Sequence, residues 1–388
     1  MLDEMLLAEN IKKYRRLSGI TQNELAVKLF VSPQSVSKWE CGISVPELSK
    51  LCEMANMFDV SLDRLIGMTK LDAEGKVFVG IDGGGTKTEF VLFDETGTIL
   101  KRLVYPGCNP TSCGIEQTCN ILKDGVDALM NVYPDVIGIY AGISGASGGD
   151  PDKKIPKFLK ENYPKITTKC ESDVLNVVAS TLNLNDDFDK CVAVICGTGS
   201  VAFAYDGDKQ ERIGGWGYLL DKAGSGYDFG REALCAALAQ RDELGPQTLI
   251  TPMVEEKIGG RVWDKISEVY SHQKDYVASF AYIVFEAYAK GDSVASEIIE
   301  YNTDRLSELI DRAAKNFGED TLVVMAGGLM AYDDILIEKI KSKVKRNYRF
   351  VVPNLPQIYG ACVLCAKMCG IKNEGFRERF NSDYKKLI

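Results

Sequence analysis

Residues 77–97 read VFVGIDGGGTKTEFVLFDETG, an apolar run that leads into Asp82 and three glycines before a second apolar run begins. This layout predicts a β-hairpin. Glycines lack a Cβ atom, so the backbone N–H groups of Gly84 and Gly85 can point at phosphate oxygens, and Thr86 adds a hydroxyl. Asp82 is placed to hold a hydrated Mg²⁺ beside those phosphates. Walker A and Rossmann loops would open a helix instead, and a purely structural tight turn is the alternative.

Two further stretches strengthen the interpretation. Residues 191–205, CVAVICGTGSVAFAY, repeat the layout of strand, small-residue turn and strand, and two such hairpins would clamp a triphosphate from both sides. Residues 321–330, TLVVMAGGLM, predict a buried strand that ends in two glycines before a helix, a flat surface on which a nucleoside can lie. Alone, this stretch would fit an ordinary strand-to-helix turn. The candidate ATP- and phosphate-binding residues are Gly84, Gly85, Thr86, Lys87, Thr198, Gly199, Gly327 and Gly328.

Strand and helix patterns alternate from residue 77 to about residue 189, and a second strand pair then begins at Cys191. This order predicts an α/β body that is duplicated, with covered sheets. We place its two lobes at residues 77–190 and 191–388. Residues 68–76 are polar and without periodicity, which predicts a linker.

Residues 1–67 show helical periodicity only and predict a separate all-α domain of five short helices. Within it, residues 21–46 read TQNELAVKLFVSPQSVSKWECGISVP. Thr21 and Glu24 form a capping-box pattern at the start of one helix. Ser32 and Pro33 form a favourable cap and first-turn pair at the start of the next.

That next helix leaves short polar side chains pointing outward, which can reach base edges in a major groove. The stretch resembles the Cro/repressor-like helix-turn-helix family, including its ending at Trp39, Glu40 and Gly42. The resemblance implies a homodimer that binds palindromic operator DNA, and a helical domain that binds a protein or only dimerises is the alternative. The candidate DNA-binding residues are Gln22, Ser32, Gln34, Ser35, Ser37 and Lys38, of which Gln22 and Lys38 are placed to meet phosphates.

Composition limits the chemistry and the partners. Residues 1–70 hold nine basic and nine acidic residues, so the rest of the 388-residue chain, with 37 basic and 46 acidic residues, carries the net charge of −9. DNA contacts must therefore come from charge placed locally on the neutral head. Twelve cysteines without a signal-like N-terminal stretch predict free thiols in a reducing cytoplasm, and no apolar run suits a membrane span. The sequence has one histidine, His272, so carboxylates must serve as the general acid or base.

The three glycine-containing stretches, together with IGGWGYLLDKAGSGYDFGREAL at 213–234 and PQIYGACVLCA at 356–366, resemble the ribonuclease H-like ATPase superfamily of actin, hexokinase and Hsp70. More closely, they resemble its BadF/BadG/BcrA/BcrD branch with the N-acetylglucosamine kinases, over about residues 77–370. The resemblance implies a body that uses ATP and Mg²⁺ to phosphorylate an amino sugar of the N-acetylglucosamine or glucosamine type.

Phosphoryl transfer to a sugar needs a carboxylate that accepts the hydroxyl proton. By resemblance this is Asp173, which lies between an apolar strand and an apolar helix and can also cap that helix. Asn109 resembles the sugar-binding asparagine of the family. The alternative is that it is only a turn residue in its loop. Trp216 is a candidate for the wall of the sugar site or for the core. The candidate substrate-binding residues are Asn109, Asp173, Ser200, Gly215, Trp216, Gly217 and Asp221.

The chain departs from the family at residues 221–225, Asp-Lys-Ala-Gly-Ser, where the kinases usually carry Gly-Asp-Glu-Gly-Ser. An ungapped match puts Lys222 in place of the aspartate that contacts the sugar, and a lysine cannot accept hydrogen bonds from hydroxyls. Asp221, one residue earlier, could take the place of that aspartate only if the loop were shifted. The alternative to a kinase is therefore a transcriptional regulator whose kinase-like body senses a sugar or nucleotide.

Three cysteines near the C-terminus raise the alternative that the chain resembles another group of ATPases in the same branch. Cys362, Cys365 and Cys369 invite comparison with the Fe–S activator ATPases. Their spacing matches one face of a helix over residues 357–368, where cysteine behaves as a small hydrophobe. We therefore expect them in the core.

Overall fold

The computed structural model describes residues 4–58, 60–67, 75–146, 149–207, 209–221 and 224–387, and only the backbone of Leu17 and Arg64. Most of the predicted linker, residues 68–74, lies outside this description. The chain divides into two compact units. The first comprises Met1–Asp173, Asn183–Asn185 and Ala361–Ile388, and the second comprises Val174–Leu182 and Asp186–Gly360.

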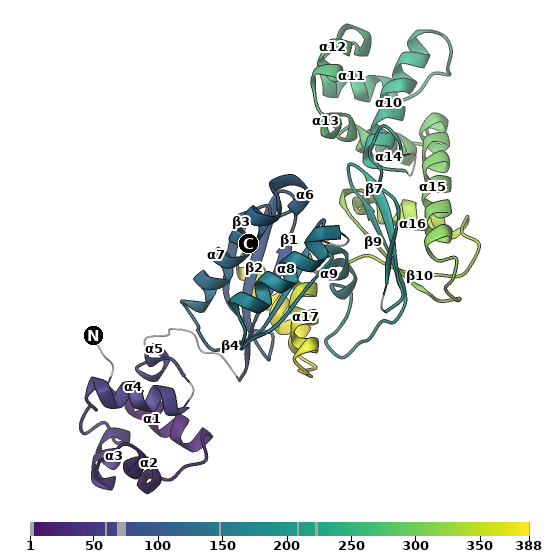
Figure 1. Cartoon of the computed structure of the whole chain (residues 1–388). Helices are drawn as coiled ribbons and strands as arrows, with labels where there is room; N and C mark the ends of the chain where they lie inside the picture. Colours follow the sequence, from purple (N-terminus) through teal and green to yellow (C-terminus); the bar gives the residue numbers. More distant parts are fainter. Residues whose placement is uncertain are drawn as a thin grey trace. The chain divides into compact units, whose positions relative to one another are not determined.

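Over residues 4–58 and 60–67 the head consists of five helices, as the sequence predicts (Figure 1). Thr21 and Glu24 form the predicted capping box, and Ser32 caps the following helix with Pro33 in its first turn. The helices are α1 (Glu4–Leu17), α2 (Gln22–Lys28), α3 (Pro33–Glu40), α4 (Leu48–Phe58) and α5 (Leu62–Leu65).

A buried ion pair joins α1 to α3 in the head. The Arg15 guanidinium donates to both carboxylate oxygens of Glu40, at 2.5 and 3.0 Å, and to the carbonyl oxygen of Ile20 at 2.7 Å. Burial raises the pKa of Glu40, but the hydrogen bonds from Arg15 and Gln22 outweigh burial and leave this pKa below its usual value. The pair therefore stays charged and fixes the two helices to each other.

The sheet of the first unit has the strand order β3-β2-β1-β4-β5, in which β1, β2 and β3 are antiparallel and β1, β4 and β5 are parallel. Its strands are β1 (Val77–Gly83), β2 (Lys87–Asp94), β3 (Ile99–Pro106), β4 (Val136–Ile143) and β5 (Thr167–Glu171). The helices around it are α6 (Pro110–Cys113), α7 (Ile115–Met130), α8 (Gly149–Asn162), α17 (Gln357–Met368) and α18 (Phe376–Leu387).

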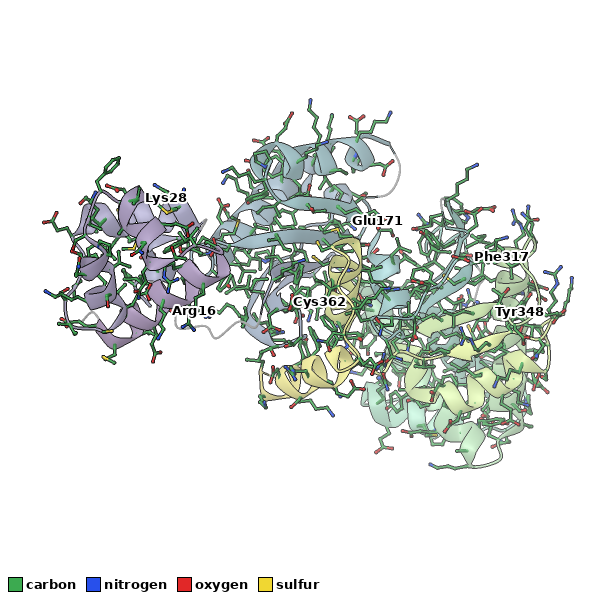
Figure 2. All side chains as sticks on the ribbon, turned by 90° about the horizontal axis from the view of Figure 1, so that it is seen from below. Arg16, Lys28, Glu171, Phe317, Tyr348 and Cys362 are labelled. Atoms are coloured by element: carbon green, nitrogen blue, oxygen red, sulfur yellow. The ribbon has the colours of Figure 1, made fainter. Side chains whose placement is uncertain are left out.

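Helix α17 packs directly on the backbone of this sheet. A Cβ atom at Gly80 would lie 2.6 Å from the Cys362 sulfur, and one at Gly138 would lie 3.3 Å from the Cys365 sulfur and 2.6 Å from that of Cys369, the residue after the helix. Cys362, labelled in Figure 2, and Cys365 are fully buried, so the prediction of a core role is confirmed for these two. This packing explains why residues 361–388 belong to the first unit, whereas the boundaries drawn from sequence place them in the second lobe.

The second sheet repeats the topology of the first, with the order β10-β9-β6-β7-β8, which confirms the predicted duplication. Its strands are β6 (Cys191–Cys196), β7 (Ser200–Tyr205), β8 (Gln210–Gly214), β9 (Leu322–Ala326) and β10 (Arg349–Val351). The helices that follow α9 (Asp173–Ala179) are α10 (Gly226–Arg241), α11 (Ile250–Ile258), η1 (Val262–Asp264), α12 (Ile266–Ser271), α13 (Lys274–Ala278), α14 (Ala281–Ala289), α15 (Ser293–Ala313), η2 (Gly328–Tyr332) and α16 (Asp333–Lys341). Among the described residues, no helix has the length and apolar character that a membrane span requires.

Removing the charge of Glu40 should destabilise the head. Glu40→Gln keeps the shape but leaves the buried Arg15 guanidinium without its counter-charge, so we expect the free energy of unfolding of the head to fall by about 3 kcal/mol. Hydrogen exchange on the full-length chain, read on peptides from residues 4–67, measures this fall. Glu53→Gln, which removes a surface ion pair with Lys50, is the control and should cost less than about 1 kcal/mol. Equal losses in both variants would contradict the account.

The same pair makes the head sensitive to acid. Because the pKa of Glu40 is lower in the folded head than its unfolded value of about 4.3, its contribution is present above that pH and is lost as pH falls through the folded pKa. Hydrogen exchange should therefore be repeated at pH values from above about 4.3 to below the folded pKa of Glu40. Over this pH range the head of the native chain should lose stability more steeply than the head of Glu40→Gln.

Candidate functional site

In the first unit the parallel strands β1, β4 and β5 end beside one another. The residues that follow these strands, Gly84, Ser144 and Asp173, therefore lie along one edge of the sheet. Ligands of α/β sheets bind in crevices outside this carboxyl edge. The fold thus gathers the first glycine-rich turn and the predicted catalytic aspartate at one edge.

The first glycine-rich turn is the hairpin that the sequence predicts, because β1 and β2 pair up to Gly83 and Thr88. A second segment packs against the turn: the N–H of Cys108 donates to the Gly84 carbonyl at 3.1 Å, and a Cβ atom at Gly107 would lie 2.1 Å from the Gly85 carbonyl oxygen. On its other side the turn is open, since a Cβ atom at Gly85 would meet no atom within 4 Å. The open side leaves room for a ligand close to the backbone.

Two carboxylates face each other in register on this hairpin, Asp82 on β1 and Glu89 on β2. Glu89 is buried and accepts hydrogen bonds from Arg102 at 2.6 Å and Tyr384 at 2.8 Å, and Lys87 forms an ion pair with it at 3.3 Å. Asp82 is half-buried beside the glycines. Mg²⁺ at phosphate sites is commonly held by one or two carboxylates, waters and the phosphates themselves, so Asp82 fits the predicted role.

Asn109 and Asp173 both lie at helix starts near this edge. The side-chain oxygen of Asn109 accepts the N–H of Thr111 at 2.8 Å, and its amide donates to the Ser144 hydroxyl at 3.3 Å. The turn role of Asn109 is therefore real, and it connects the loop after β3 with the loop after β4. Asp173 begins α9, is half-buried and accepts a hydrogen bond from the Ser172 hydroxyl at 3.5 Å.

The second unit builds a similar turn between β6 and β7. The N–H of Gly197 donates to the Gly199 carbonyl at 2.8 Å, and the start of α10 attaches to the turn through Gly226 and Tyr227, which donate to Gly197 and Thr198 at 2.8 and 3.1 Å. Ser200 begins β7 and is buried. The turn after β6 is thus fixed to the N-terminus of α10, and its carbonyl oxygens accept the first N–H groups of that helix.

A cavity of about 510 Å³ joins the second and third glycine stretches, since Thr198 and Gly328 both line it. Gly327, which precedes Gly328, has a φ of 107°, and a Cβ atom there would lie 2.3 Å from the Cys196 carbonyl oxygen. The close approach of β6 and β9 at this point therefore requires glycine. The volume is in the range of small-molecule sites.

Sequence reasoning missed other residues of this cavity. Asp275 accepts a hydrogen bond from the Thr198 hydroxyl at 2.7 Å, and Tyr282 and Tyr332 line the cavity. The Tyr332 ring is stacked on Phe285, with centroids 4.1 Å apart. These residues come from α13, α14 and η2 and share no spacing or motif, so only the folded chain shows that they lie together.

The loop after β8 holds the remaining candidates. The Asp221 carboxylate accepts the backbone N–H groups of Gly215 and Trp216, the latter at 2.9 Å, and the N–H of Asp221 donates to the Gly217 carbonyl at 2.9 Å. Trp216 is 66% exposed with Arg212 over its ring, so the core alternative for this tryptophan is wrong. Lys222 lies outside the described residues.

In the head, α3 carries most of the predicted DNA contacts. Gln34 and Lys38 are exposed, whereas Ser37 is partly exposed. Two other side chains are engaged within the head: the hydroxyls of Ser32 and Ser35 lie 2.9 Å apart. The Gln22 amide donates to Glu40 at 2.8 Å, which holds it against α3. Figure 2 shows further cations of the head, Arg16 and Lys28.

Comparison with known proteins gives two family matches. Residues 79–363 match the profile of the BadF/BadG/BcrA/BcrD ATPase family, and residues 11–65 match a helix-turn-helix profile. The chain is 28% identical over 306 residues to N-acetyl-D-glucosamine kinase of Dictyostelium discoideum, an alignment that covers 70% of this chain and 91% of the relative.

A second relative is N-acetylmuramic acid/N-acetylglucosamine kinase of Clostridium acetobutylicum, 24% identical over 308 residues, with 76% of this chain and 99% of the relative covered. Among solved structures, a ROK family transcriptional regulator, a homologue of the E. coli MLC protein, is similar with a TM-score of 0.51. It is 12% identical, and 99% of each chain is covered. This last likeness is one of fold.

The neighbouring glycines after β9 should respond differently to alanine. Gly327→Ala forces a left-handed backbone and a clash with Cys196, so we expect a loss of about 2–4 kcal/mol in the stability of the second unit. Gly328→Ala meets no atom within 4 Å and should change stability by less than about 1 kcal/mol. Hydrogen exchange on β6 and β9 peptides measures both. If the two variants behaved alike, the close approach at Gly327 would not be required.

Proposed function

Since the chain belongs to the BadF/BadG/BcrA/BcrD ATPase family, we propose that it is an ATP-dependent kinase of an amino sugar, of the N-acetylglucosamine or glucosamine type, that carries a DNA-binding head. The observation that carries this proposal is the pair of glycine turns, each at the carboxyl edge of its own sheet. The kinase relatives support the substrate class.

The proposal assigns ATP to the glycine turns. Gly85 in the first unit and Gly199 in the second are each open to phosphate oxygens, since neither glycine has a neighbour where a side chain would be. Lys87 adds positive charge that Glu89 holds in place. Asp82 holds hydrated Mg²⁺, which when bound neutralises phosphate charge. The nucleoside lies in the cavity that Gly328 lines.

Asp173 is the group that accepts the proton of the sugar hydroxyl as it attacks. A carboxylate in this role orients the hydroxyl and takes its proton, a contribution of about 10²–10⁴ in rate. Asn109 offers its amide to ring hydroxyls while its side-chain oxygen holds the turn. Trp216, exposed on its loop, supplies an apolar wall.

The second candidate function is a transcriptional regulator whose body senses a sugar or nucleotide without turning it over. Two observations favour it. The Asp221 carboxylate already accepts two backbone N–H groups of its own loop, which leaves it less able to replace the aspartate usual in the family. The fold likeness to a ROK family transcriptional regulator covers 99% of the chain. In this account sugar binding changes the affinity of the head for operator DNA.

An ADP-release assay separates the two candidates. We expect turnover on one of N-acetylglucosamine, glucosamine, N-acetylmuramic acid, N-acetylmannosamine and glucose. Asp173→Asn should lower kcat by about 10²-fold or more without changing ATP affinity, because it removes proton acceptance but keeps shape. Asp152→Asn, at an exposed position of α8, is the control. No turnover on any sugar, with sugar-dependent operator affinity, would replace the kinase by the sensor.

The head is proposed to bind a palindromic operator as a homodimer, with half-sites about one helical turn apart. Gln34→Ala should relax sequence preference, because its exposed amide is placed to read a base edge. Lys38→Ala should weaken binding to all sequences and reduce the salt slope by about 1. Selection from genomic fragments with full-length protein, followed by anisotropy at several salt concentrations, tests this. Failure to enrich a common sequence would count against DNA recognition.

A further inference from the structure

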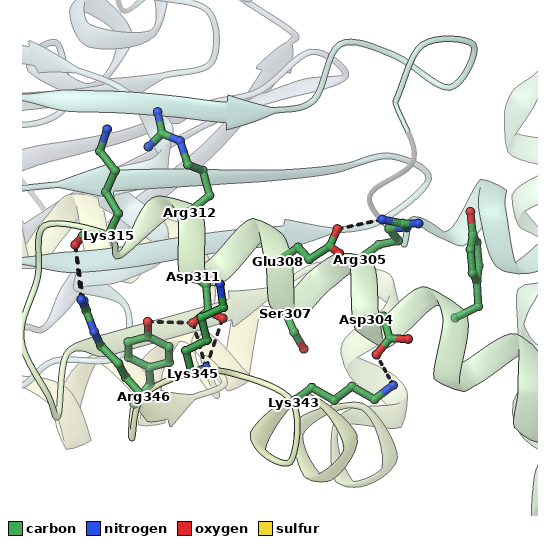
Figure 3. A pocket seen from close by; sticks show the side chains of 12 residues that line it. Asp304, Arg305, Ser307, Glu308, Asp311, Arg312, Lys315, Lys343, Lys345 and Arg346 are labelled. Carbon is green, nitrogen blue, oxygen red and sulfur yellow. Dashed lines mark hydrogen bonds and ion pairs between the residues drawn. The ribbon is translucent and has the colours of Figure 1, made fainter.

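A separate cavity of about 720 Å³ lies in the second unit, along α15 and the segment 343–348 (Figure 3). It shares no lining residue with the cavity that Thr198 and Gly328 line. We call it the basic groove. The cationic side chains that line it are Arg305, Arg312, Lys315, Lys343, Lys345 and Arg346.

The groove concentrates positive charge on an acidic protein. It has six cations against three carboxylates, Asp304, Glu308 and Asp311. The chain as a whole has a net charge of −9. Because like charges repel, such a concentration costs stability unless an anion offsets it.

The carboxylates of the groove are already engaged by protein groups. Asp304 forms an ion pair with Lys343, and Glu308 forms one with Arg305 at 2.8 Å. Figure 3 shows both pairs. Asp311 accepts the backbone N–H of Lys345 at 3.1 Å. Asp311 receives hydrogen bonds from neutral groups only and keeps its charge, so the groove still carries more positive than negative charge.

Two lysines of the groove lack a charged partner. Within the part of the chain that the structure describes, neither the Lys315 nor the Lys345 ammonium forms an ion pair, and both side chains are exposed. Arg312, which also lines the groove, forms one ion pair, with Glu211 at 2.9 Å. The groove thus offers the ammonium groups of Lys315 and Lys345 to an incoming anion.

The segment that carries Lys345 is held in place. The Arg346 guanidinium donates to the carbonyl oxygens of Ala314 and Phe317, at 3.0 and 2.6 Å, where α15 ends. The buried Tyr348 hydroxyl donates to Asp311 at 3.0 Å, and burial together with Asp311 raises the pKa of Tyr348 to about 12. The walls of the groove are therefore preorganised, which lowers the entropic cost of binding.

We propose that the basic groove binds a small phosphate monoester. A phosphate dianion matches the net positive charge, and lysine and arginine are the residues that bind phosphate most often. The groove volume is within the range of small-molecule sites. The cations gather around one cavity, whereas duplex DNA presents its phosphates along an extended strip. This site stands independently of the proposed kinase reaction, since it uses none of the same residues.

Titration calorimetry of the full-length protein with glycerol 3-phosphate tests the proposal, with glycerol as the ligand that lacks the phosphate. We expect saturable binding of glycerol 3-phosphate alone. Lys315→Gln combined with Lys345→Gln should weaken it about tenfold or more, because each lysine contributes a charge-assisted hydrogen bond. Lys190→Gln combined with Lys209→Gln removes the same charge at exposed positions of the second unit outside the groove and should preserve affinity.

Three results would overturn the proposal. The first is no binding of glycerol 3-phosphate to the native protein. The second is equal weakening in both double variants, which would reflect net charge alone. The third is unchanged glycerol 3-phosphate affinity in the Lys315/Lys345 variant, which would show that the phosphate binds at another site. If that variant also bound a random duplex more weakly, the groove would be a nucleic-acid surface instead.

Discussion

The body depends on one steric constraint, the close approach of backbone to backbone where a strand ends in glycine. In the first sheet the Gly107 backbone packs on the Gly85 carbonyl, and in the second the Gly327 backbone packs on the Cys196 carbonyl. A side chain at either position would separate the segments. Because each approach lies at the carboxyl edge of its sheet, it both closes the fold locally and leaves N–H groups of the adjacent turns accessible to a ligand.

The carboxylate proposed for catalysis also lies on a rigid part of the fold. Asp173 begins a helix directly after β5, and its neighbours along the edge are fixed by strand pairing rather than by flexible loops. The loop that carries Asp221 is different, since its carboxylate is occupied by its own backbone. The sites proposed for phosphate and for proton transfer are thus built more firmly than the site proposed for the sugar, and this contrast is the reason why a sensor is the second candidate.

The sequence predicts features set by nearby residues. Both hairpins, the duplicated topology and the capping box at Thr21 follow from local patterns, and all are present. It does not predict contacts between distant segments. The packing of Cys362 on Gly80, the place of Asp275 in the cavity and the ion pair of Arg15 with Glu40 depend on the folded chain, because no spacing connects the partners.

Calorimetric titration of the full-length protein with ATP and Mg²⁺ measures whether a nucleoside triphosphate binds at the glycine turns. The methyl group added by Gly85→Ala or Gly199→Ala would meet no protein atom within 4 Å. It could therefore clash only with a ligand bound at the turn. We expect the native chain to bind ATP and each variant to bind it about tenfold or more weakly. Gly318→Ala, equally free of neighbours, should bind as the native chain does. No binding at millimolar ATP, or equal affinity in all variants, would contradict ATP binding at these turns.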